Sequence, residues 1–275
     1  MQDFTESMAA QVVRPRNNAN YKGQNGHIVI VAGNERFGGA AIMSAQAAVY
    51  AGAGLVTVAT AAKNHAPLHA RLPEAMVIDW ADANLPILLR QADVIVVGPG
   101  LGVDAAALGI LSLVLSAVTD SAALIIDGSA ITLIAENHIK VLHQQTIWTP
   151  HPIELQRLVQ LAPPAQTDIV LPVVAHDQLP GILVAKGAPT RTIADHAAFR
   201  NTSGGPAMAT GGTGDTLTGV IAAFCGQFGF NVHVVAAAVW THSAAADLLA
   251  ADQYVAVPSQ VAAAVPKIMR RLSQQ

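Results

Sequence analysis

The sequence of 275 residues contains few charged side chains, few aromatic ones and a single cysteine. Asp, Glu, Lys and Arg together make up 12% of the chain, hydrophobic residues make up 52%, and the formal net charge is −3 at pH 7. A chain without a basic excess lacks the electrostatic signature of a protein that binds nucleic acid or an anionic membrane, so we expect neither partner. So sparse a charged surface also indicates that part of it is covered, and we expect a homo-oligomer, a tetramer in particular.

The lone cysteine, Cys225, excludes an internal disulfide framework. The N-terminal stretch MQDFTESMAAQ has no apolar core, so it is not a signal peptide. Residues 40–62 and 216–240 carry no acid or base, but glycine and amide residues interrupt both runs, which argues against a membrane-spanning helix. Together these features predict a cytoplasmic protein.

No change in composition divides the chain, and we expect one domain over residues 1–275, with residues 1–20 as an N-terminal extension. Short apolar runs without alternation are typical of strands buried on both faces, hence of a mainly parallel sheet. Such runs occupy residues 27–33, 55–60, 75–80, 93–98, 123–128, 146–149, 182–187 and 190–194. Helical patterns alternate with them, at residues 39–52, 104–118, 152–160, 214–228, 233–251 and 258–272. The order is that of an α/β fold with helices on both faces of the sheet; the proline-rich residues 161–172 are predicted to be a loop.

Ligands of open parallel sheets bind at the carboxyl ends of the strands, and four of these strands end in glycine-bearing or polar loops. The loops read GNERFGGAA, GPGLG, TPHPIEL and VAKGAPT. GPGLG does not match a dinucleotide fingerprint, because Val103 stands where the third glycine is needed. It is either a tight turn or a ligand contact. His151 is likewise either a polar loop residue or a contact, and the Lys186 loop either a β-turn or a phosphate site.

The segment GGTGD at residues 211–215 is the most informative of all. It precedes an apolar stripe with helical spacing, so a helix begins near Gly214. Free N–H groups at a helix N-terminus bind anions, and glycines let the backbone approach the ligand closely. Asp215 is then either a helix cap or a base beside the anion. A cap does not require three glycines, which favours the second interpretation and predicts an anion hole at Gly211, Gly212, Thr213 and Gly214.

A carboxylate beside an anion site predicts phosphoryl chemistry in which Asp215 accepts a proton from a hydroxyl while the amides hold the developing charge. The chain has no G-x-x-x-x-G-K-[ST] segment, so a nucleotide would be held in another way than by a Walker loop.

GTGD at the start of a core helix resembles the ribokinase-like superfamily, in which this aspartate is the base. The wider set of motifs resembles the ADP/ATP-dependent NAD(P)H-hydrate dehydratases from about residue 22 to the C-terminus. These motifs are KGQNGHIVIVAGNERFGGAAIMSAQAAVYAGAGLVTVAT, LPEAM, GPGLG, TPHPIEL, VAKGAPT, NTSGGPAMATGGTGDTLTGVIAAF and THSAAAD. The resemblance implies a three-layer sandwich with a mainly parallel sheet.

The resemblance also implies an ADP-dependent lyase that converts the S epimer of hydrated NADH or NADPH back to the reduced cofactor, releasing AMP and phosphate. ADP, or ATP, would be the cosubstrate, and Mg²⁺ is expected between phosphate oxygens, although no residue is identified as its ligand. Matching motif positions would place the hydrated cofactor against Ala40 or Ala41, Gly100, Gly102, His151 and Asp215. The adenine nucleotide would contact Lys186, Gly187, Ala188, Pro189, Thr190 and Gly214.

The sequence departs from the family pattern at three points. Gly205 replaces an asparagine and Ala207 a glycine, and in DGSAI only Asp127 of two family acids is kept. The epimerase domain often fused ahead of such domains is not expected here, so a separate NAD(P)HX epimerase would be the functional partner.

Three other functions fit part of the pattern. A small-molecule kinase of the same superfamily, acting on a vitamin precursor, would use the same base and anion hole. A nucleotide sensor without catalysis would have no use for a carboxylate beside its anion. A metal hydrolase is disfavoured, because His65 and His69 lack the glutamate of H-E-x-x-H.

Overall fold

The computed structural model describes residues 1–159, 176 and 178–275. One ten-stranded sheet has the order β1-β10-β9-β8-β7-β6-β5-β2-β3-β4. The strands from β8 to β4 run parallel to one another, as the apolar runs predict. They span β2 (His27–Val31), β3 (Leu55–Thr60), β4 (Met76–Asp79), β5 (Val94–Val97), β6 (Ala123–Ile126), β7 (Thr146–Trp148) and β8 (Ile182–Ala185).

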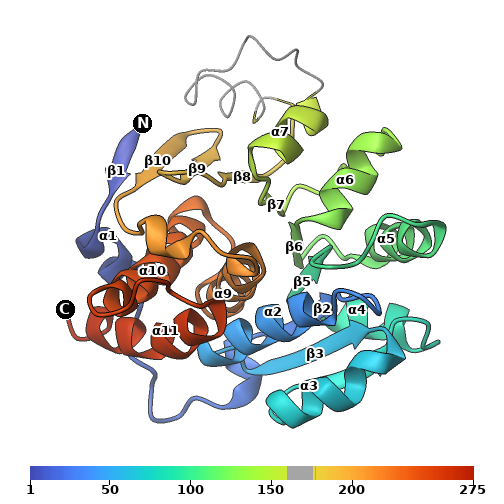
Figure 1. Ribbon diagram of the computed structural model, residues 1–275, viewed down its shortest axis with the longest axis horizontal. Coiled ribbons are helices and arrows are strands. Elements are labelled where there is room, and N and C mark those ends of the chain that lie inside the picture. Colours follow the sequence, from blue (N-terminus) through green and yellow to red (C-terminus); the bar gives the residue numbers. More distant parts are fainter. Residues whose placement is uncertain (160–175, 177) are drawn as a thin grey trace.

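Both faces of the central strands are buried, which explains why their sequences show no alternation. Ile28 and Ile30 of β2 pack into one hydrophobic cluster, whereas Val29 and Val31 pack into the cluster on the opposite face. The first cluster includes α2 (Gly38–Tyr50), α9 (Thr213–Phe228), α10 (Val232–Ala250) and α11 (Pro258–Leu272). The second includes α4 (Leu85–Gln91), α5 (Ala105–Ala117), α6 (Ser129–Glu136) and α7 (Pro152–Val159). Figure 1 shows these layers, and the predicted three-layer α/β sandwich is confirmed.

The N-terminal segment contributes to the fold more than an extension would. Strand β1 (Gln2–Phe4) pairs in parallel with β10 (Ala197–Asn201) at the end of the sheet, and α1 (Glu6–Val12) packs against α10. Strand β9 (Arg191–Ala194) is antiparallel to both β8 and β10. Phe4 is 1% exposed, and its ring lies edge-on to that of Phe199 at 5.2 Å. The sequence did not predict β1, β10 or α1, because segments of three, five and seven residues carry little periodicity.

Six other short elements of the described residues were not predicted: the helices α3 (His65–Arg71), α4 and α6, and three 3₁₀ turns at Lys22–Asn25, Ala62–Asn64 and Pro206–Met208. The longer elements lie within two residues of their predicted ends. The loop predicted for residues 161–172, and the last residue of the helix predicted for 152–160, lie outside the described residues.

Helix α10 is long and apolar enough to cross a membrane by length and composition. In this fold, 72% of that apolar stretch is buried inside the protein, where α10 packs against α9, α11 and α1. A core helix of a folded protein has the same properties, so α10 gives no support to a membrane location.

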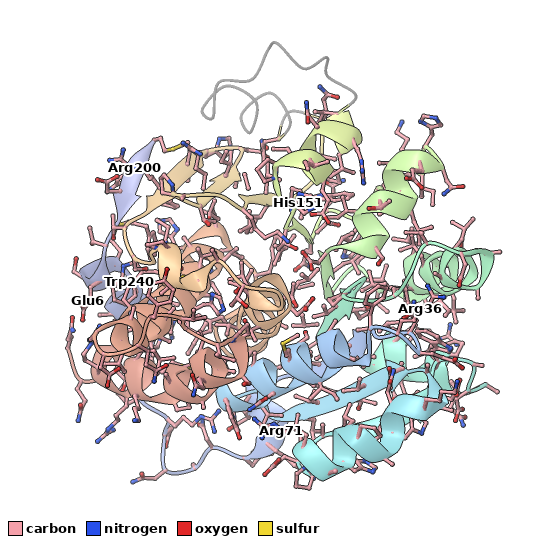
Figure 2. All side chains as sticks on the ribbon, viewed as in Figure 1. Glu6, Arg36, Arg71, His151, Arg200 and Trp240 are labelled. Carbon is pink, nitrogen blue, oxygen red and sulfur yellow. The ribbon has the colours of Figure 1, made fainter. Side chains whose placement is uncertain are left out.

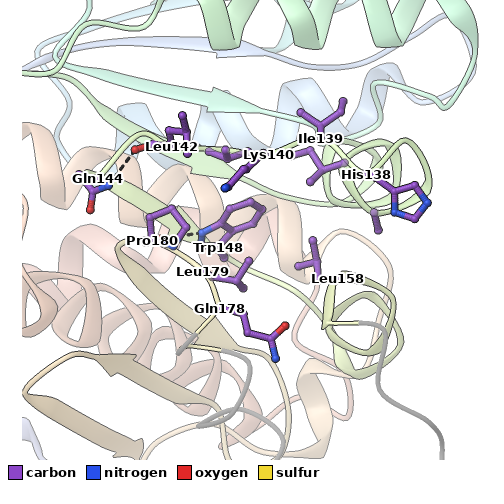
Figure 3. A pocket seen from close by; sticks show the side chains of 13 residues that line it. His138, Ile139, Lys140, Leu142, Gln144, Trp148, Leu158, Gln178, Leu179 and Pro180 are labelled. Carbon is purple, nitrogen blue, oxygen red and sulfur yellow. Dashed lines mark hydrogen bonds between the residues drawn. The ribbon is translucent and has the colours of Figure 1, made fainter.

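A cavity of about 460 Å³ lies between the end of α6, the segment before β7 and residues 178–180 (Figure 3). Trp148 lies along its wall, and its indole Nε1 donates a hydrogen bond to the Pro180 carbonyl at 3.0 Å. None of the ligand-binding residues predicted from the sequence lines this cavity.

Candidate active site

Helix α9 begins at Thr213, directly after the left-handed residue Gly212 (φ 97°). The first intrahelical bond runs from the Thr216 N–H to the Gly212 carbonyl at 3.0 Å. Within the part of the chain that the structure describes, the N–H groups of Thr213, Gly214 and Asp215 donate no hydrogen bond. Free donors at the positive end of a helix are suited to binding an anion, and two of these three, Thr213 and Gly214, belong to the predicted anion hole.

The glycines of this loop serve different purposes. A Cβ at Gly212 would lie 2.4 Å from the sulfur of Met43 on α2, and the positive φ also disfavours any other residue. At Gly214, a Cβ would lie 3.3 Å from the Lys186 ammonium, which places that charge beside the first turn of α9. Nothing lies within 4 Å of a Cβ built at Gly211. The backbone therefore requires glycine at Gly212, whereas Gly211 leaves open space where a ligand could approach.

Asp215 stands in the first turn of α9 and is partly buried. Burial and the neighbouring Asp127 raise its pKa to about 6, and Lys186 counteracts part of this rise. No described residue donates a hydrogen bond to its side-chain oxygens. A carboxylate of this pKa is mostly ionised at neutral pH, yet it is more basic than an ordinary aspartate, which suits a general base.

Lys186, at the end of β8, joins the charged groups of the site. Its ammonium donates to Asp127 Oδ1 at 2.7 Å and lies 3.9 Å from Glu154 Oε2. Burial lowers the pKa of Lys186, but the attraction of Asp127 and Glu154 outweighs burial, and the net shift is upward. Asp127 also accepts a hydrogen bond from Thr149 Oγ1 at 2.7 Å. The site thus keeps one fixed positive charge near the anion-binding turn.

His151 follows β7 at the start of α7, and its side chain is 47% exposed (Figure 2). Its Nδ1 accepts from the Ile153 N–H at 3.2 Å, while the backbone N–H of His151 donates to Glu154 Oε2 at 2.8 Å. Burial and Lys186 lower the pKa of His151. The imidazole is therefore held against the start of α7, with Nε2 3.4 Å from Glu154 Oε1, although about half of the side chain stays exposed.

Glu154 is 6% exposed, and the sequence assigned it only to the first turn of a helix. Burial raises the pKa of Glu154, and Lys186 and the His151 N–H oppose that rise. Glu154 follows β7 by six residues and lies three residues after His151, a predicted ligand contact. This closeness was the sequence signal that could have identified it as part of the site.

The loops after β2 and β5 pair with each other. The N–H groups of Gly33 and Asn34 donate to the carbonyls of Pro99 and Gly100 at 2.8 and 2.7 Å. Gly100 has a φ of 60°, and a Cβ there would lie 2.9 Å from Ala40 Cβ, so these two predicted contacts are neighbours. At the predicted contact Gly102, the N–H donates to Ser129 Oγ at 3.1 Å.

Of the two alanines offered for the α2 contact, Ala41 is fully buried in the core and Ala40 is partly exposed. The side chain that can face a ligand is therefore that of Ala40. The loop is braced by Asn64, which is buried and donates to the carbonyls of Gly33 and Asn34 at 2.8 and 3.2 Å. Nothing in the sequence pattern singled out Asn64.

The predicted nucleotide segment, residues 186–190, forms the turn between β8 and β9. Gly187 and Ala188 are exposed, and the Thr190 hydroxyl donates to the Gly187 carbonyl at 3.1 Å. The Lys186 N–H donates to the Pro150 carbonyl at 2.9 Å, which joins this turn to the segment that carries His151. The turn therefore lies beside the anion-binding end of α9, with Lys186 between them.

Among the described residues, no three His, Cys, Asp or Glu side chains converge to hold a metal ion. Asp127 and Glu154 offer the oxygen ligands that Mg²⁺ prefers, but both face the Lys186 ammonium. This donor set fits a magnesium ion bound mainly through phosphate oxygens and water, and it does not fit a cage made by the protein alone.

These observations place a base, three free N–H donors and a fixed cation at the carboxyl edge of a parallel sheet. A sequence profile of the NAD(P)H-hydrate dehydratases matches residues 28–267. The chain belongs to the NAD(P)H-hydrate dehydratase family.

Relatives in this family cover the whole chain. The ADP-dependent (S)-NAD(P)H-hydrate dehydratase of Lactiplantibacillus plantarum is 45% identical, over 100% of this chain and 99% of that protein. A ribokinase-like superfamily protein from Enterococcus faecalis superposes with a TM-score of 0.96 at 41% identity, covering 100% of this chain and 97% of the other. The ADP/ATP-dependent NAD(P)H-hydrate dehydratase of Bacillus subtilis, co-crystallised with ATP and Mg²⁺, gives 0.87 at 27% identity, covering 98% of each chain. The ribokinase-like fold expected from the motifs is thereby confirmed.

The two substitutions in the family's motif lie just before this site. Gly205 precedes the 3₁₀ turn Pro206–Met208, and nothing lies within 4 Å of a Cβ built on it. The family's asparagine would therefore fit at this position. Ala207 is partly buried against the core, and its carbonyl accepts from the Ala256 N–H at 2.9 Å.

Proposed function

We propose that the protein is an ADP-dependent dehydratase that repairs the S epimer of hydrated NADH or NADPH, returning the reduced cofactor with release of AMP and phosphate. The observation that carries this proposal is Asp215, a carboxylate with a pKa raised to about 6, beside three unpaired helix N–H groups and the Lys186 ammonium. A base beside an anion site fits any phosphoryl transfer. Membership of the dehydratase family is the reason for proposing hydrated NAD(P)H as the group that accepts the phosphoryl group.

The reaction uses these groups in sequence. Asp215 takes the proton of the hydroxyl on the hydrated nicotinamide ring, and the oxygen bonds to the terminal phosphorus of ADP as the bond to AMP breaks. The free N–H groups of Thr213 and Gly214 hold the negative charge that develops on the transferring phosphoryl oxygens. The ring nitrogen then supplies the electron pair that expels phosphate, and the resulting iminium ion loses a proton from the adjacent ring carbon to give the reduced cofactor. Asp215 releases the hydroxyl proton to solvent, which restores the carboxylate for the next turnover.

Two sets of loops divide the binding of the reactants in this proposal. Ala40, Gly100, Gly102 and His151 contact the hydrated cofactor in this proposal, because the loops after β2 and β5 pair with each other and α2, which follows the first loop, packs against α9. The turn from Lys186 to Thr190 contacts the adenine nucleotide, with the ammonium placed at its phosphates. Asp215 and Gly214 lie between the two reactants, where the phosphoryl group is transferred.

Magnesium belongs to the proposal as a companion of the nucleotide. When bound, the ion would neutralise charge on the phosphate oxygens, and Asp127 and Glu154, which lie beside Lys186, would be the carboxylates that could hold it. Lys186 keeps both carboxylates paired in the absence of the ion, so the site does not depend on the metal for its arrangement.

The cellular setting follows from the reaction. Only the S epimer is used, so an NAD(P)HX epimerase is needed to recover the R epimer, and we place both activities in the cytoplasm. The sparse surface charge of the chain supports assembly as a homo-oligomer, a tetramer in particular.

The test is to incubate the protein with NADHX, ADP and magnesium, and to follow the absorbance of reduced nicotinamide. We expect recovery of NADH and stoichiometric release of AMP and phosphate. The same assay with ATP distinguishes the two nucleotides. Absence of recovery with both would overturn the proposal, and phosphorylation of a small alcohol by the same preparation would favour the kinase instead.

A further inference from the structure

Helix α9 begins in a loop whose glycines leave its backbone weakly restrained. Gly211, Gly212 and Gly214 carry no side chains that could anchor the turn, and ordering glycine costs more conformational entropy than ordering other residues. Phosphoryl transfer nevertheless needs the base and the N–H donors in a fixed geometry, since a displacement of about 1 Å can cost about 100-fold in rate. Some other group must hold this turn in place.

Two threonine hydroxyls supply part of the restraint. Thr213 Oγ1 donates toward the carbonyls of Met208 and Thr210, at 2.8 and 3.0 Å, which ties the first residue of α9 to the loop before it. Thr216 is fully buried one turn later, and its Oγ1 donates to the Thr213 carbonyl at 3.0 Å. Asp215 lies on the turn between these two threonines.

The hydroxyl of Thr216 is in turn held by His242 on the neighbouring helix α10. His242 is 2% exposed, and its Nε2 lies 2.8 Å from Thr216 Oγ1. A hydroxyl has one proton to donate. The Thr213 carbonyl can only accept, so both bonds form together when the imidazole carries its proton on Nε2 and donates it to Thr216.

Among the described residues, Thr216 is the only hydrogen-bond partner of the His242 side chain. His242 stands in an alanine- and valine-rich helix whose buried residues pack into the core, and burying a polar ring there costs free energy that an aliphatic side chain would not. Burial lowers the pKa of His242 to about 4, so it is an uncharged N–H donor at neutral pH. Its chemistry is directed at Thr216.

We propose that His242 is a positioning residue of the dehydratase reaction: through Thr216 and Thr213 it fixes the first turn of α9, and with it Asp215 and the anion-binding N–H groups. This inference rests on the proposed function, because it is tested by measuring kcat and KM of the dehydratase reaction. It assigns to α10 a part in catalysis although His242 lies behind the site and touches neither reactant.

The variants His242→Leu, His242→Gln and Thr216→Val separate positioning from packing. His242→Leu keeps the volume apolar and removes the donor, and we expect kcat to fall about tenfold or more while KM for ADP changes less than about threefold. Glutamine places an N–H close to the position of Nε2, so His242→Gln restores most of kcat. Thr216→Val matches the loss of His242→Leu, and the double variant loses no more than either one, because both remove the same link.

Thr241 provides the matched control. It precedes His242 on the same helix, it is buried, and its hydroxyl has no hydrogen-bond partner among the described residues. Thr241→Val therefore perturbs the same part of the core without touching the link, and should retain wild-type kcat.

Each outcome decides between the two roles. A His242→Leu enzyme with unchanged kcat, or additive losses in the double variant, would overturn the positioning role. If His242→Leu does not fold, full activity of Thr216→Val overturns it just as well. An inactive wild-type protein would instead contradict the proposed function, which keeps the two failures apart.

Discussion

Replacing Asp215 by asparagine should abolish turnover and at the same time stabilise the fold. The carboxylate receives no hydrogen bond from a described residue, and burial and Asp127 raise its pKa from 3.8 to about 6. A group whose folded-state pKa is raised binds its proton more tightly in the folded protein than in the unfolded one. Folding therefore becomes less favourable as the pH rises from about 4 through about 6 and Asp215 ionises inside the fold.

The size of the effect follows from the shift. About two pKa units correspond to about 3 kcal/mol of unfavourable free energy above pH 7. Two effects make the charged carboxylate less unfavourable than this: it keeps some contact with solvent, and it lies at the positive end of α9. We therefore expect the substitution to raise the free energy of unfolding by about 2 kcal/mol. For a chain of this size, that raises the melting temperature by roughly 4–8 °C. Loss of the general base lowers the rate by about 100- to 10,000-fold.

The assay is thermal unfolding of the apo protein followed by circular dichroism, at pH 7.5 and again near pH 4, with turnover measured on the same preparations. Asp215→Asn should be more stable than wild type at pH 7.5, and the difference should shrink toward pH 4, where both forms carry a neutral side chain. Asp127→Asn is the control with the opposite sign, because it leaves the buried ammonium of Lys186 with one partner fewer. An Asp215→Asn protein that is less stable at pH 7.5, or that keeps near-normal turnover, would refute the reasoning.

Three further predictions concern the same site. The rate at low substrate should fall as the pH drops below about 6, because Asp215 must be ionised to accept a proton, and the profile of kcat/KM against pH checks this. Gly212→Ala should cost about tenfold or more in kcat, since its Cβ would displace the end of α9, whereas Gly211→Ala, with open space around its Cβ, should change kcat less than about threefold. Lys186→Met should raise KM for ADP and also destabilise the protein by about 3 kcal/mol or more, measured by urea unfolding, because Asp127 loses its buried partner; wild-type stability would show that water replaces the ammonium.

The sequence predicted those parts of the fold that depend on local pattern. The long helices and the parallel strands were found because their apolar residues repeat over many positions, as in α9 and β3. Strand β1 was missed, because its pairing with β10 joins residues almost 200 positions apart and leaves no local mark, whereas β10 was missed because its five residues carry little periodicity. Register and strand order were likewise beyond reach, since both depend on contacts between distant segments.

The candidate site divides in the same way. Asp215, the glycines beside it and Lys186 were found because their chemistry is unusual for a loop. Glu154 was seen only as a helix start, and its ionic contact with Lys186 arises from the adjacency of β7 and β8. Buried residues that hold the site in place, such as His242, were not recognised. A histidine within an apolar helix carries no sequence signal that tells a hydrogen-bonding role from a packing role.

Strand β1 closes one end of the sheet, and this has a practical consequence. Residues Gln2–Phe4 cover the outer edge of β10, and Arg200 holds Asp3 through two charge-assisted bonds at 2.6 and 2.9 Å. Without that cover, β10 would present unpaired backbone donors and acceptors to other molecules, the usual starting point of aggregation. Removing Gln2–Phe4 should therefore lower the yield of soluble protein, although Asp215 and Lys186 are untouched.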